Sequence, residues 1–125
     1  MENTQMKITV MSFGFKYGEP TGYNMVFDVR AFKNPFYVKN LKNMTGNDKA
    51  VQDYVLSSPA SREFLEKLTE MTEFIINVSA KRKSIVIAIG CTGGQHRSVT
   101  FANMLAQNLK SKGYEQRVVH RDINK

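Results

Sequence analysis

The 125-residue sequence contains a single cysteine, three prolines and no tryptophan. One cysteine cannot form an intramolecular disulfide, so we expect a reducing compartment. No apolar run approaches the roughly 18 residues that a membrane-spanning helix needs, and residues 1–10 carry charged and amide side chains where a secretory signal needs an apolar core. The sequence therefore predicts a cytoplasmic protein that makes no contact with a membrane.

Acidic residues are scarce as well. Eleven Asp and Glu stand against eighteen Lys and Arg, which leaves a formal net charge of +7. This excess favours polyanionic partners such as RNA, DNA or an acidic surface, although charge alone cannot select among them. The remaining proportions, 42% hydrophobic and 23% charged residues, are those of an ordinary globular protein. We therefore expect one domain over residues 1–125 with a core of its own.

The most informative stretch is residues 84–98, SIVIAIGCTGGQHRS. Its apolar run up to Gly90 predicts a strand buried on both faces, and an amphipathic helical pattern begins about seven residues later. The glycines between them let the backbone approach a ligand, and the helix N-terminus presents unpaired N–H groups with partial positive charge. The stretch therefore indicates an anion site, to which His96 and Arg97 add a titratable ring and a bidentate cation.

Shorter patterns predict the other elements of the fold. Residues 7–13, 23–29 and 115–120 predict strands, residues 32–46 predict an ordered loop, and the patterns ending near residues 56, 80 and 113 predict helices. A strand, helix and strand in succession at this length form a parallel crossover. The sequence thus predicts an α/β fold of three layers, in which helices pack on a small, partly parallel sheet of about four strands that contains a βαβ unit.

In open α/β sheets, ligands bind beyond the carboxyl ends of the strands. The loop of residues 90–97 follows the central strand there, and His120 and Arg121 follow the last strand. Lys16 shares this edge if the first strand is parallel to the others. We therefore expect basic groups and ring nitrogens from separate strands to converge on one anion pocket.

Several residues keep a second interpretation. The short connection between the first two strands leaves the place of Arg30 open, and this residue could instead form an ion pair with Asp28. His96 and His120 could each be a core histidine bonded to the backbone, although two His-Arg pairs at strand ends favour a ligand site. The basic run at residues 81–83 suits either a helix C-terminus or a nucleic-acid patch.

Cys91, Arg97 and Ser98 also have the C-x5-R-[ST] spacing of cysteine-dependent phosphatases. In such enzymes, a thiolate at a helix N-terminus attacks a phosphate that loop amides and the arginine hold. A general acid is also needed, for which Asp28 or Asp122 could serve, but no motif places either. Cys91 could instead be a small, half-buried residue at a strand end. Catalysis therefore remains an open alternative to binding, and the sequence predicts no metal or cofactor.

Six motifs occur in the order and spacing of the C-terminal domain of the RapZ family, the RNase adapter proteins, which the chain resembles over nearly its whole length. They are residues 12–18 (SFGFKYG), 27–30 (FDVR), 34–35 (NP), 45–48 (TGND), 90–99 (GCTGGQHRSV) and 120–122 (HRD). The resemblance implies a regulatory domain that binds a phosphorylated amino sugar, glucosamine-6-phosphate. It also implies binding of a small regulatory RNA and of the endoribonuclease that processes it, with self-association into a homo-oligomer.

The resemblance and the strand-end pattern together give the candidate residues. Those for ligand binding are Cys91, Thr92, Gly93, Gly94, His96, Arg97, Ser98, Lys16, Arg30, His120 and Arg121, and those for RNA binding are Arg117, Arg121 and Lys125. The chain departs from the family pattern in three places. It contains no G-x-x-x-x-G-K-[ST] loop, so we expect a stand-alone domain without nucleotide binding of that kind. Phe36 stands where a histidine can contribute to the sugar pocket, and only Lys125 supplies a cation after Arg121. A scaffold that has lost its ligand is a further alternative.

Overall fold

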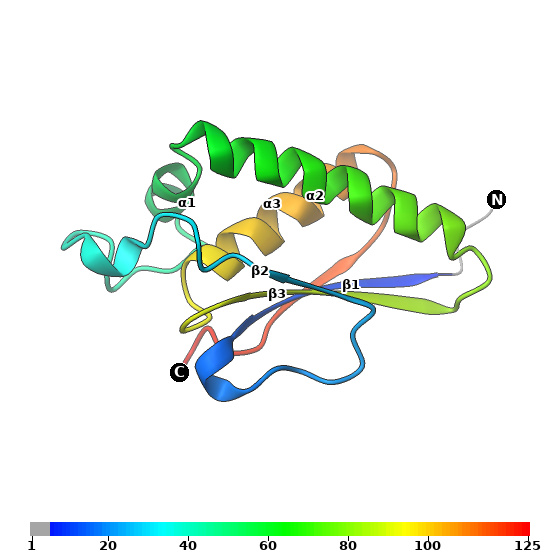
Figure 1. Cartoon of the computed structure of the whole chain (residues 1–125), viewed down its shortest axis with the longest axis horizontal. Helices are drawn as coiled ribbons and strands as arrows, with labels where there is room; N and C mark the ends of the chain where they lie inside the picture. Colours follow the sequence, from blue (N-terminus) through cyan, green and yellow to red (C-terminus); the bar gives the residue numbers. More distant parts are fainter. Residues whose placement is uncertain (1–5) are drawn as a thin grey trace.

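The structure, a computed structural model, describes residues 6–125 (Figure 1). Residues 1–5, part of the segment judged unlike a signal peptide, lie outside the described residues. The strands are β1 (Lys7–Gly14), β2 (Met25–Asp28), β3 (Ser84–Cys91) and β4 (Arg117–His120), and the α-helices are α1 (Lys49–Val55), α2 (Pro59–Val78) and α3 (Arg97–Ser111). Two single 3-10 turns, η2 (Phe15–Tyr17) and η3 (Pro35–Tyr37), complete the fold. No helix among the described residues is both long and apolar enough to cross a membrane.

The four strands form one sheet in the order β2-β3-β1-β4, and every pair is parallel. The α/β class and the βαβ units are confirmed, since α2 connects β2 to β3 and α3 connects β3 to β4. The sheet is parallel throughout rather than in part. A parallel β2 is possible despite its short connection because β2 pairs with β3 and not with β1. The carboxyl ends of β1, β2 and β3 therefore lie at one edge.

The three α-helices lie over one face of the sheet, and the segment of residues 15–24 passes beneath the other face (Figure 1). The third layer is therefore this segment and not a helix. The main core lies between the sheet and the helices, where Ile87 and Ile89 of β3 meet Phe101 and Leu105 of α3, all fully buried. Each such side chain contributes roughly 1.5–3 kcal/mol to the free energy of unfolding.

Beneath the sheet, the rings of Phe13 and Phe15 pack edge to face with their centroids 4.8 Å apart. This pair explains why Gly90 ends the apolar run, because a Cβ at Gly90 would lie 2.5 Å from the ring of Phe13. Contacts this short do not occur between real side chains, so only glycine fits. The packing brings the loop after β3 close to the end of β1.

Candidate functional site

A cavity of about 270 Å³ opens beyond the carboxyl ends of the strands, between the loop after β3 and the segment that contains η3. It is lined by Lys16, Asn34, Phe36, Tyr37, Cys91, Thr92, Gly93, Gln95, His96 and Arg97. Most of the loop residues expected to bind a ligand are therefore brought together here, and Lys16 joins them from the end of β1. No carboxylate contributes to this lining.

The loop between β3 and α3 carries unpaired backbone donors, and two of its residues, Gly93 and Gln95, line this cavity. Within the described part of the chain, the N–H groups of Gly93, Gly94 and Gln95 form no hydrogen bond with another residue, whereas the carbonyls of Thr92 and Gln95 are engaged. α3 then begins with no capping side chain and no acidic residue in its first turn. The positive end of the helix dipole and the loop amides are therefore available to an anion.

Arg97, the first residue of α3, is 5% exposed. Its Nη1 donates to the carbonyl oxygens of Arg30 at 2.6 Å and Phe32 at 3.2 Å, and its Nη2 donates to Thr92 Oγ1 at 3.4 Å. Nε is buried without a partner, and no described carboxylate forms an ion pair with this guanidinium. A buried charge with unmet donors is costly, so the site favours a negatively charged ligand that would neutralise it.

His96 lies next to Arg97 on the cavity wall, and it is 7% exposed. Its Nε2 lies 3.1 Å from the carbonyl oxygen of Lys42, which can only accept, so this nitrogen carries the proton. Burial lowers the pKa of His96 below its ordinary value. The neutral ring therefore ties the segment after η3 to the loop, while the positive charge of the cavity comes from Arg97 and Lys16.

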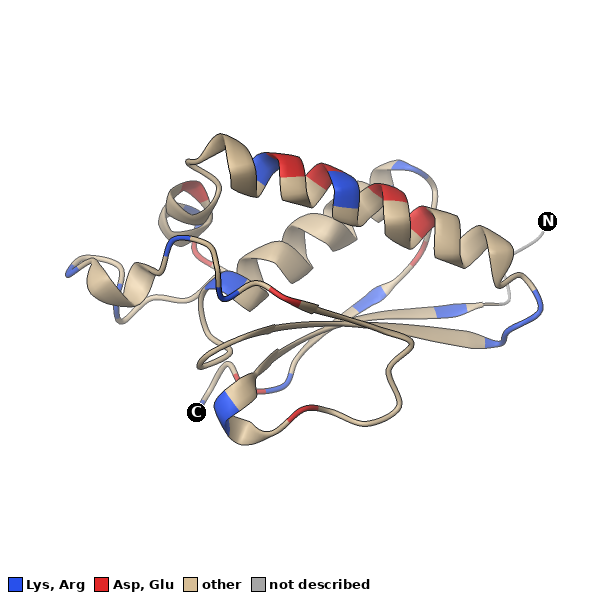
Figure 2. Cartoon of the chain, viewed as in Figure 1, with Lys and Arg blue, Asp and Glu red and all other residues tan. Residues whose placement is uncertain are grey.

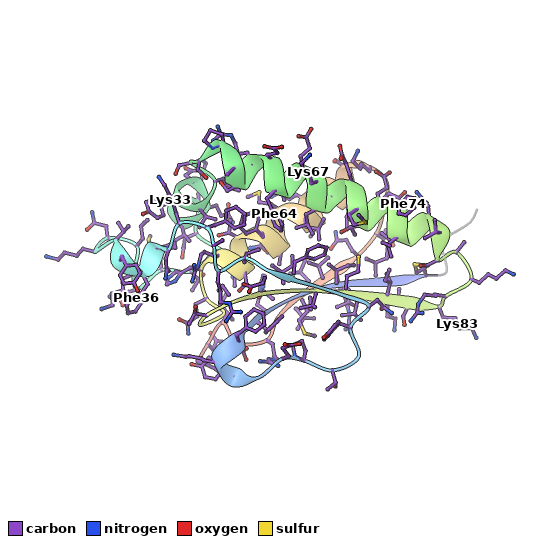
Figure 3. All side chains as sticks on the ribbon, viewed as in Figure 1. Lys33, Phe36, Phe64, Lys67, Phe74 and Lys83 are labelled. Carbon is purple, nitrogen blue, oxygen red and sulfur yellow. The ribbon has the colours of Figure 1, made fainter. Side chains whose placement is uncertain are left out.

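Lys16 and two aromatic side chains form the mouth of the cavity. The backbone N–H of Lys16 donates to the carbonyl of Thr92 at 3.2 Å, which fixes η2 beside the loop. Phe36 and Tyr37 of η3 are 49% and 82% exposed, and their rings pack edge to face. Phe36 projects from η3 at the end of the molecule in Figure 3. These rings offer apolar surface to the carbon skeleton of a ligand.

The sequence candidates did not include Asn34, Phe36, Tyr37 or Gln95 as ligand-contacting residues. The first three lie in a loop without periodicity, so no pattern placed them beside a strand end. The Asn34-Pro35 pair was the available signal: Asn34 Oδ1 accepts from the N–H of Phe36 at 3.1 Å and caps η3. Gln95 stands within the glycine loop itself, where its neighbours had already been singled out.

The structure does not bring His120 and Arg121 to the cavity. His120 is half-buried; it accepts from Ser12 Oγ through Nδ1 at 2.7 Å and donates from Nε2 to Asn103 Oδ1 at 2.9 Å. Arg121 donates to the carboxylate of Asp122, at 2.7 Å from Nη2, and to the carbonyl of Gly18 at 2.6 Å. Both side chains are occupied by protein partners, so the strand-end pattern alone misplaces them.

Three further candidates also lie outside the lining. Arg30 forms an ion pair with Asp28 at 2.7 Å and stacks 4.0 Å above the ring of Phe15, which agrees with its alternative interpretation. Ser98 is fully buried and accepts a hydrogen bond from Cys91 Sγ at 3.2 Å. Gly94, with φ of +78°, lets the loop pass over the end of β1.

The carboxylates offered as general acids have environments that favour their ionised forms. The hydrogen bonds from Arg30 hold the pKa of Asp28 below its ordinary value. Burial alone would raise the pKa of Asp122, but donors on Arg121, Gly14 and Lys125 outweigh it and lower the pKa. Neither carboxylate lines the cavity. Residues 6–125 also contain no group of three or more His, Cys, Asp or Glu that could hold a metal ion.

The three candidates for RNA contacts lie on β4 and the turn that follows it. Arg117 donates from Nε to Thr9 Oγ1 at 3.1 Å. Lys125 forms an ion pair with Asp122 at 3.1 Å, and its Nζ lies 4.8 Å from the ring centroid of Tyr17. Arg117 and Lys125 thus bond to their neighbours, as Arg121 does.

The parallel sheet with its helices defines an α/β domain, and a glycine loop and an uncapped helix lie beside a buried arginine at its strand ends. The sequence model of the RapZ C-terminal domain matches residues 6–124. This chain belongs to that family, as its six motifs predicted.

Proteins of known sequence show the same relationship. The chain is 51% identical over 126 residues to a "nucleotide-binding protein" of Limosilactobacillus reuteri (strain DSM 20016), covering 99% of the chain and 43% of that protein. It is 50% identical over 122 residues to one of Clostridium botulinum (strain Loch Maree / Type A3) and 53% identical over 122 residues to one of Caldicellulosiruptor saccharolyticus, each match covering 96% of the chain and 42% of the relative. The chain thus spans less than half the length of these relatives.

Proposed function

We propose that this chain is a cytoplasmic regulatory domain that binds a small phosphorylated metabolite, a sugar phosphate in the first place, in the cavity beside Arg97. The observation that carries this proposal is the guanidinium of Arg97, which is 5% exposed, lines the cavity and has no carboxylate partner among the described residues. A phosphoryl group supplies both the missing charge and acceptors for the unmet donors.

In this arrangement the phosphoryl group lies against the amides of Gly93 to Gln95 at the start of α3, with Lys16 on the open side. The rest of the ligand packs on Phe36 and Tyr37. The volume of about 270 Å³ lies at the small end of ligand pockets, which suits a phosphorylated sugar better than a dinucleotide. Glucosamine-6-phosphate, which the family resemblance implies, is the first compound to test.

A thermal-shift panel tests this proposal with inorganic phosphate, glucosamine-6-phosphate, glucose-6-phosphate, AMP and unphosphorylated glucosamine. We expect the sugar phosphates to stabilise the domain, by about 2.7 kcal/mol at 100 times the dissociation constant, and glucosamine to leave it unchanged. Equal responses to glucosamine and to its phosphate, or no response to any phosphorylated compound, would contradict the proposal.

A pair of lysine variants locates the binding site. Lys16→Gln removes an exposed cation from the cavity mouth, so calorimetry should show weaker sugar-phosphate binding with an unchanged melting temperature. Lys39→Gln removes another exposed lysine that does not line the cavity, and its affinity should match that of the wild type. Equal affinities for the two variants would place the ligand elsewhere.

Binding of a small RNA, and with it of an endoribonuclease, is a second proposal. Its support is the net charge of +7 together with the family resemblance. Because neutralised phosphates release counterions, any complex should weaken steeply between about 50 and 200 mM salt. A filter-binding titration with a structured small RNA tests this, and the absence of a complex at the lower salt concentration would end the proposal.

Phosphatase activity receives less support from the site. Cys91 is 3% exposed, and the two candidate acids are ionised and lie outside the cavity lining. We therefore expect no turnover of an aryl phosphate. Turnover that disappears in Cys91→Ser would restore the enzyme alternative, and phosphate binding without turnover would exclude both the enzyme and the ligand-free scaffold.

A further inference from the structure

The ligand cavity is enclosed by chain segments that contain no acidic residue. Its lining comes from three places: Lys16 after β1, residues 34–37 around η3, and residues 91–97 between β3 and α3. The sequence has no Asp or Glu in residues 29–47 or 74–114, which contain the second and third of these places. Figure 2 shows basic positions but no acidic ones along the segment that carries η3. The wall of the cavity therefore carries charge of one sign.

Two carboxylates that follow strands of the sheet already have cationic partners. Asp28, at the end of β2, accepts hydrogen bonds from Arg30 Nε at 2.9 Å and Arg30 Nη2 at 2.7 Å. Asp122, after β4, accepts from Arg121 Nη2 at 2.7 Å and from the N–H of Gly14 at 2.8 Å. Neither carboxylate lines the cavity. A cationic group on a ligand would thus find no negative charge in the wall.

The neutral oxygens of the wall also have partners within the protein. The carbonyl of Thr92 accepts from the N–H of Lys16 at 3.2 Å, and the carbonyl of Gln95 accepts from the N–H of Gly46 at 2.8 Å. Asn34 Oδ1 accepts from the backbone of η3 at 3.1 Å. The unmet groups described above, the loop amides and the Nε of the buried arginine, are all donors. The cavity is therefore richer in free donors than in free acceptors.

Aromatic rings can also hold a cation, but the ring at the mouth of the cavity already has one. Lys42 Nζ lies over the ring of Phe36, 4.8 Å from its centroid. Tyr37 packs edge to face against the same ring, with the centroids 5.5 Å apart. A ligand ammonium at this ring would therefore meet the like charge of Lys42.

We propose that the cavity selects its ligand by charge: it takes sugar phosphates whose other groups are neutral or acidic, and it discriminates against those with a free amine. This inference rests on the proposed function, because the phosphoryl group is what brings the sugar to Arg97. A hydroxyl can accept hydrogen bonds from the free donors of the wall, whereas an ammonium can only donate. Glucosamine-6-phosphate, which the family resemblance implies, is then a weaker ligand than glucose-6-phosphate.

Calorimetry with glucose-6-phosphate and glucosamine-6-phosphate tests this proposal, because the two compounds differ only in the hydroxyl or amine at one carbon. We expect glucose-6-phosphate to bind about three- to tenfold more tightly at low salt, since an ammonium in the positive field of Lys16 and Arg97 is repelled. The difference should shrink at high salt, which screens this repulsion. Equal affinities, or tighter binding of the amino sugar, would overturn this inference and leave the proposed function standing. Binding of neither compound would overturn both.

A pair of asparagine variants tests the physical cause. Asn34→Asp places a carboxylate in the wall and keeps the acceptor that caps η3, so the preference for glucose-6-phosphate should fall by about threefold or more. Asn24→Asp is the matched control. Asn24 Oδ1 also accepts from a backbone N–H, that of Val86 at 2.8 Å, but it lies outside the lining, so the preference should equal that of the wild type. With both variants shown to be folded by circular dichroism, an unchanged preference in Asn34→Asp, or equal changes in the two, would overturn the proposal.

Discussion

Two His-Arg pairs follow strands of the same parallel sheet, and the structure uses them in opposite ways. His96 and Arg97, after β3, line a cavity, and Arg97 keeps a buried Nε without a partner. His120 and Arg121, after β4, donate and accept within the protein. The same dipeptide therefore lines a cavity in one place and forms a structural cluster in the other.

The difference lies in what each arginine finds beside it. Arg121 is followed by Asp122, a fully buried carboxylate that neutralises it and also accepts from the N–H of Gly14 at 2.8 Å. Arg97 is followed by Ser98, and its described partners are neutral carbonyl and hydroxyl oxygens. An arginine after a strand thus keeps a charge that no carboxylate neutralises where the fold brings none beside it.

The largest expected effect comes from breaking the structural cluster around Asp122. Asp122→Ala removes the acceptor shared by Gly14, Arg121 and Lys125, so urea unfolding should show a loss of about 3–5 kcal/mol. Asp53→Ala removes the partner of an exposed ion pair with Lys49 and should cost less than about 1 kcal/mol. Similar losses in the two variants would show that Asp122 is not a structural centre.

The next effect comes from the contact between the two regions. Gly94 has a φ of +78°, and a Cβ there would lie 2.6 Å from the nitrogen of Gly14 and 3.0 Å from Cβ of Asp122. Gly94→Ala should therefore destabilise the domain by about 2–3 kcal/mol and weaken sugar-phosphate binding, because the loop must move. Gly22→Ala, which has a similar φ and open space around it, separates backbone strain from the clash and should cost less. Equal costs would mean that the contact with Gly14 does not matter.

Arg97 itself sharpens the comparison, because it lines the cavity and also donates hydrogen bonds within the protein. Arg97→Gln should abolish measurable sugar-phosphate binding by calorimetry and lower the free energy of unfolding by about 2 kcal/mol, since two carbonyls lose a charged donor. Arg62→Gln is the matched control: Arg62 also donates to a carbonyl, that of Leu56, but lies outside the cavity lining, so binding should persist. Retained binding in Arg97→Gln would contradict the proposed site.

The smallest effect concerns pH and includes both histidines. Burial lowers the pKa of His96 and of His120 below the ordinary value of 6.5, so the unfolded chain binds protons that the folded chain does not. Stability is therefore fully present above about pH 6.5 and falls as the pH decreases, by less than about 1.4 kcal/mol per histidine and pH unit. Asp28 and Asp122, whose pKa values are lowered from 3.8, add their losses only in more acidic solution.

Urea unfolding at pH 7.5 and 5.5 measures this slope. In His120→Gln the slope should be smaller than in the wild type, because one of the two titrating groups is gone, although its stability at pH 7.5 is also lower. A slope of unchanged size would assign the pH dependence to other groups.

Much of the fold followed from local patterns. The strand β3 and the helix that ends near residue 80 could be predicted because strand burial and helical periodicity act within a few residues. The start of α2 is local as well, since Ser58 Oγ accepts from the N–H of Ser61 at 3.2 Å. The position of β2 in the sheet could not be predicted from the sequence. Its pairing with β3 depends on strands far apart in the chain, and a short connection beneath the sheet gives no local sign of it.

The candidate site can likewise be separated into features set by the local sequence and features set by tertiary packing. Sequence alone determined the glycine loop, the start of α3 and the presence of Arg97, because turn chemistry, helix ends and strand ends are set by neighbours in the chain. Only the tertiary structure decided that Asp122 is buried against Gly14, where it also holds Arg121, that Phe36 and Tyr37 line the cavity, and that Lys16 joins it. Those outcomes depend on which side chains meet across the sheet, and such meetings depend on packing between segments that are distant in sequence.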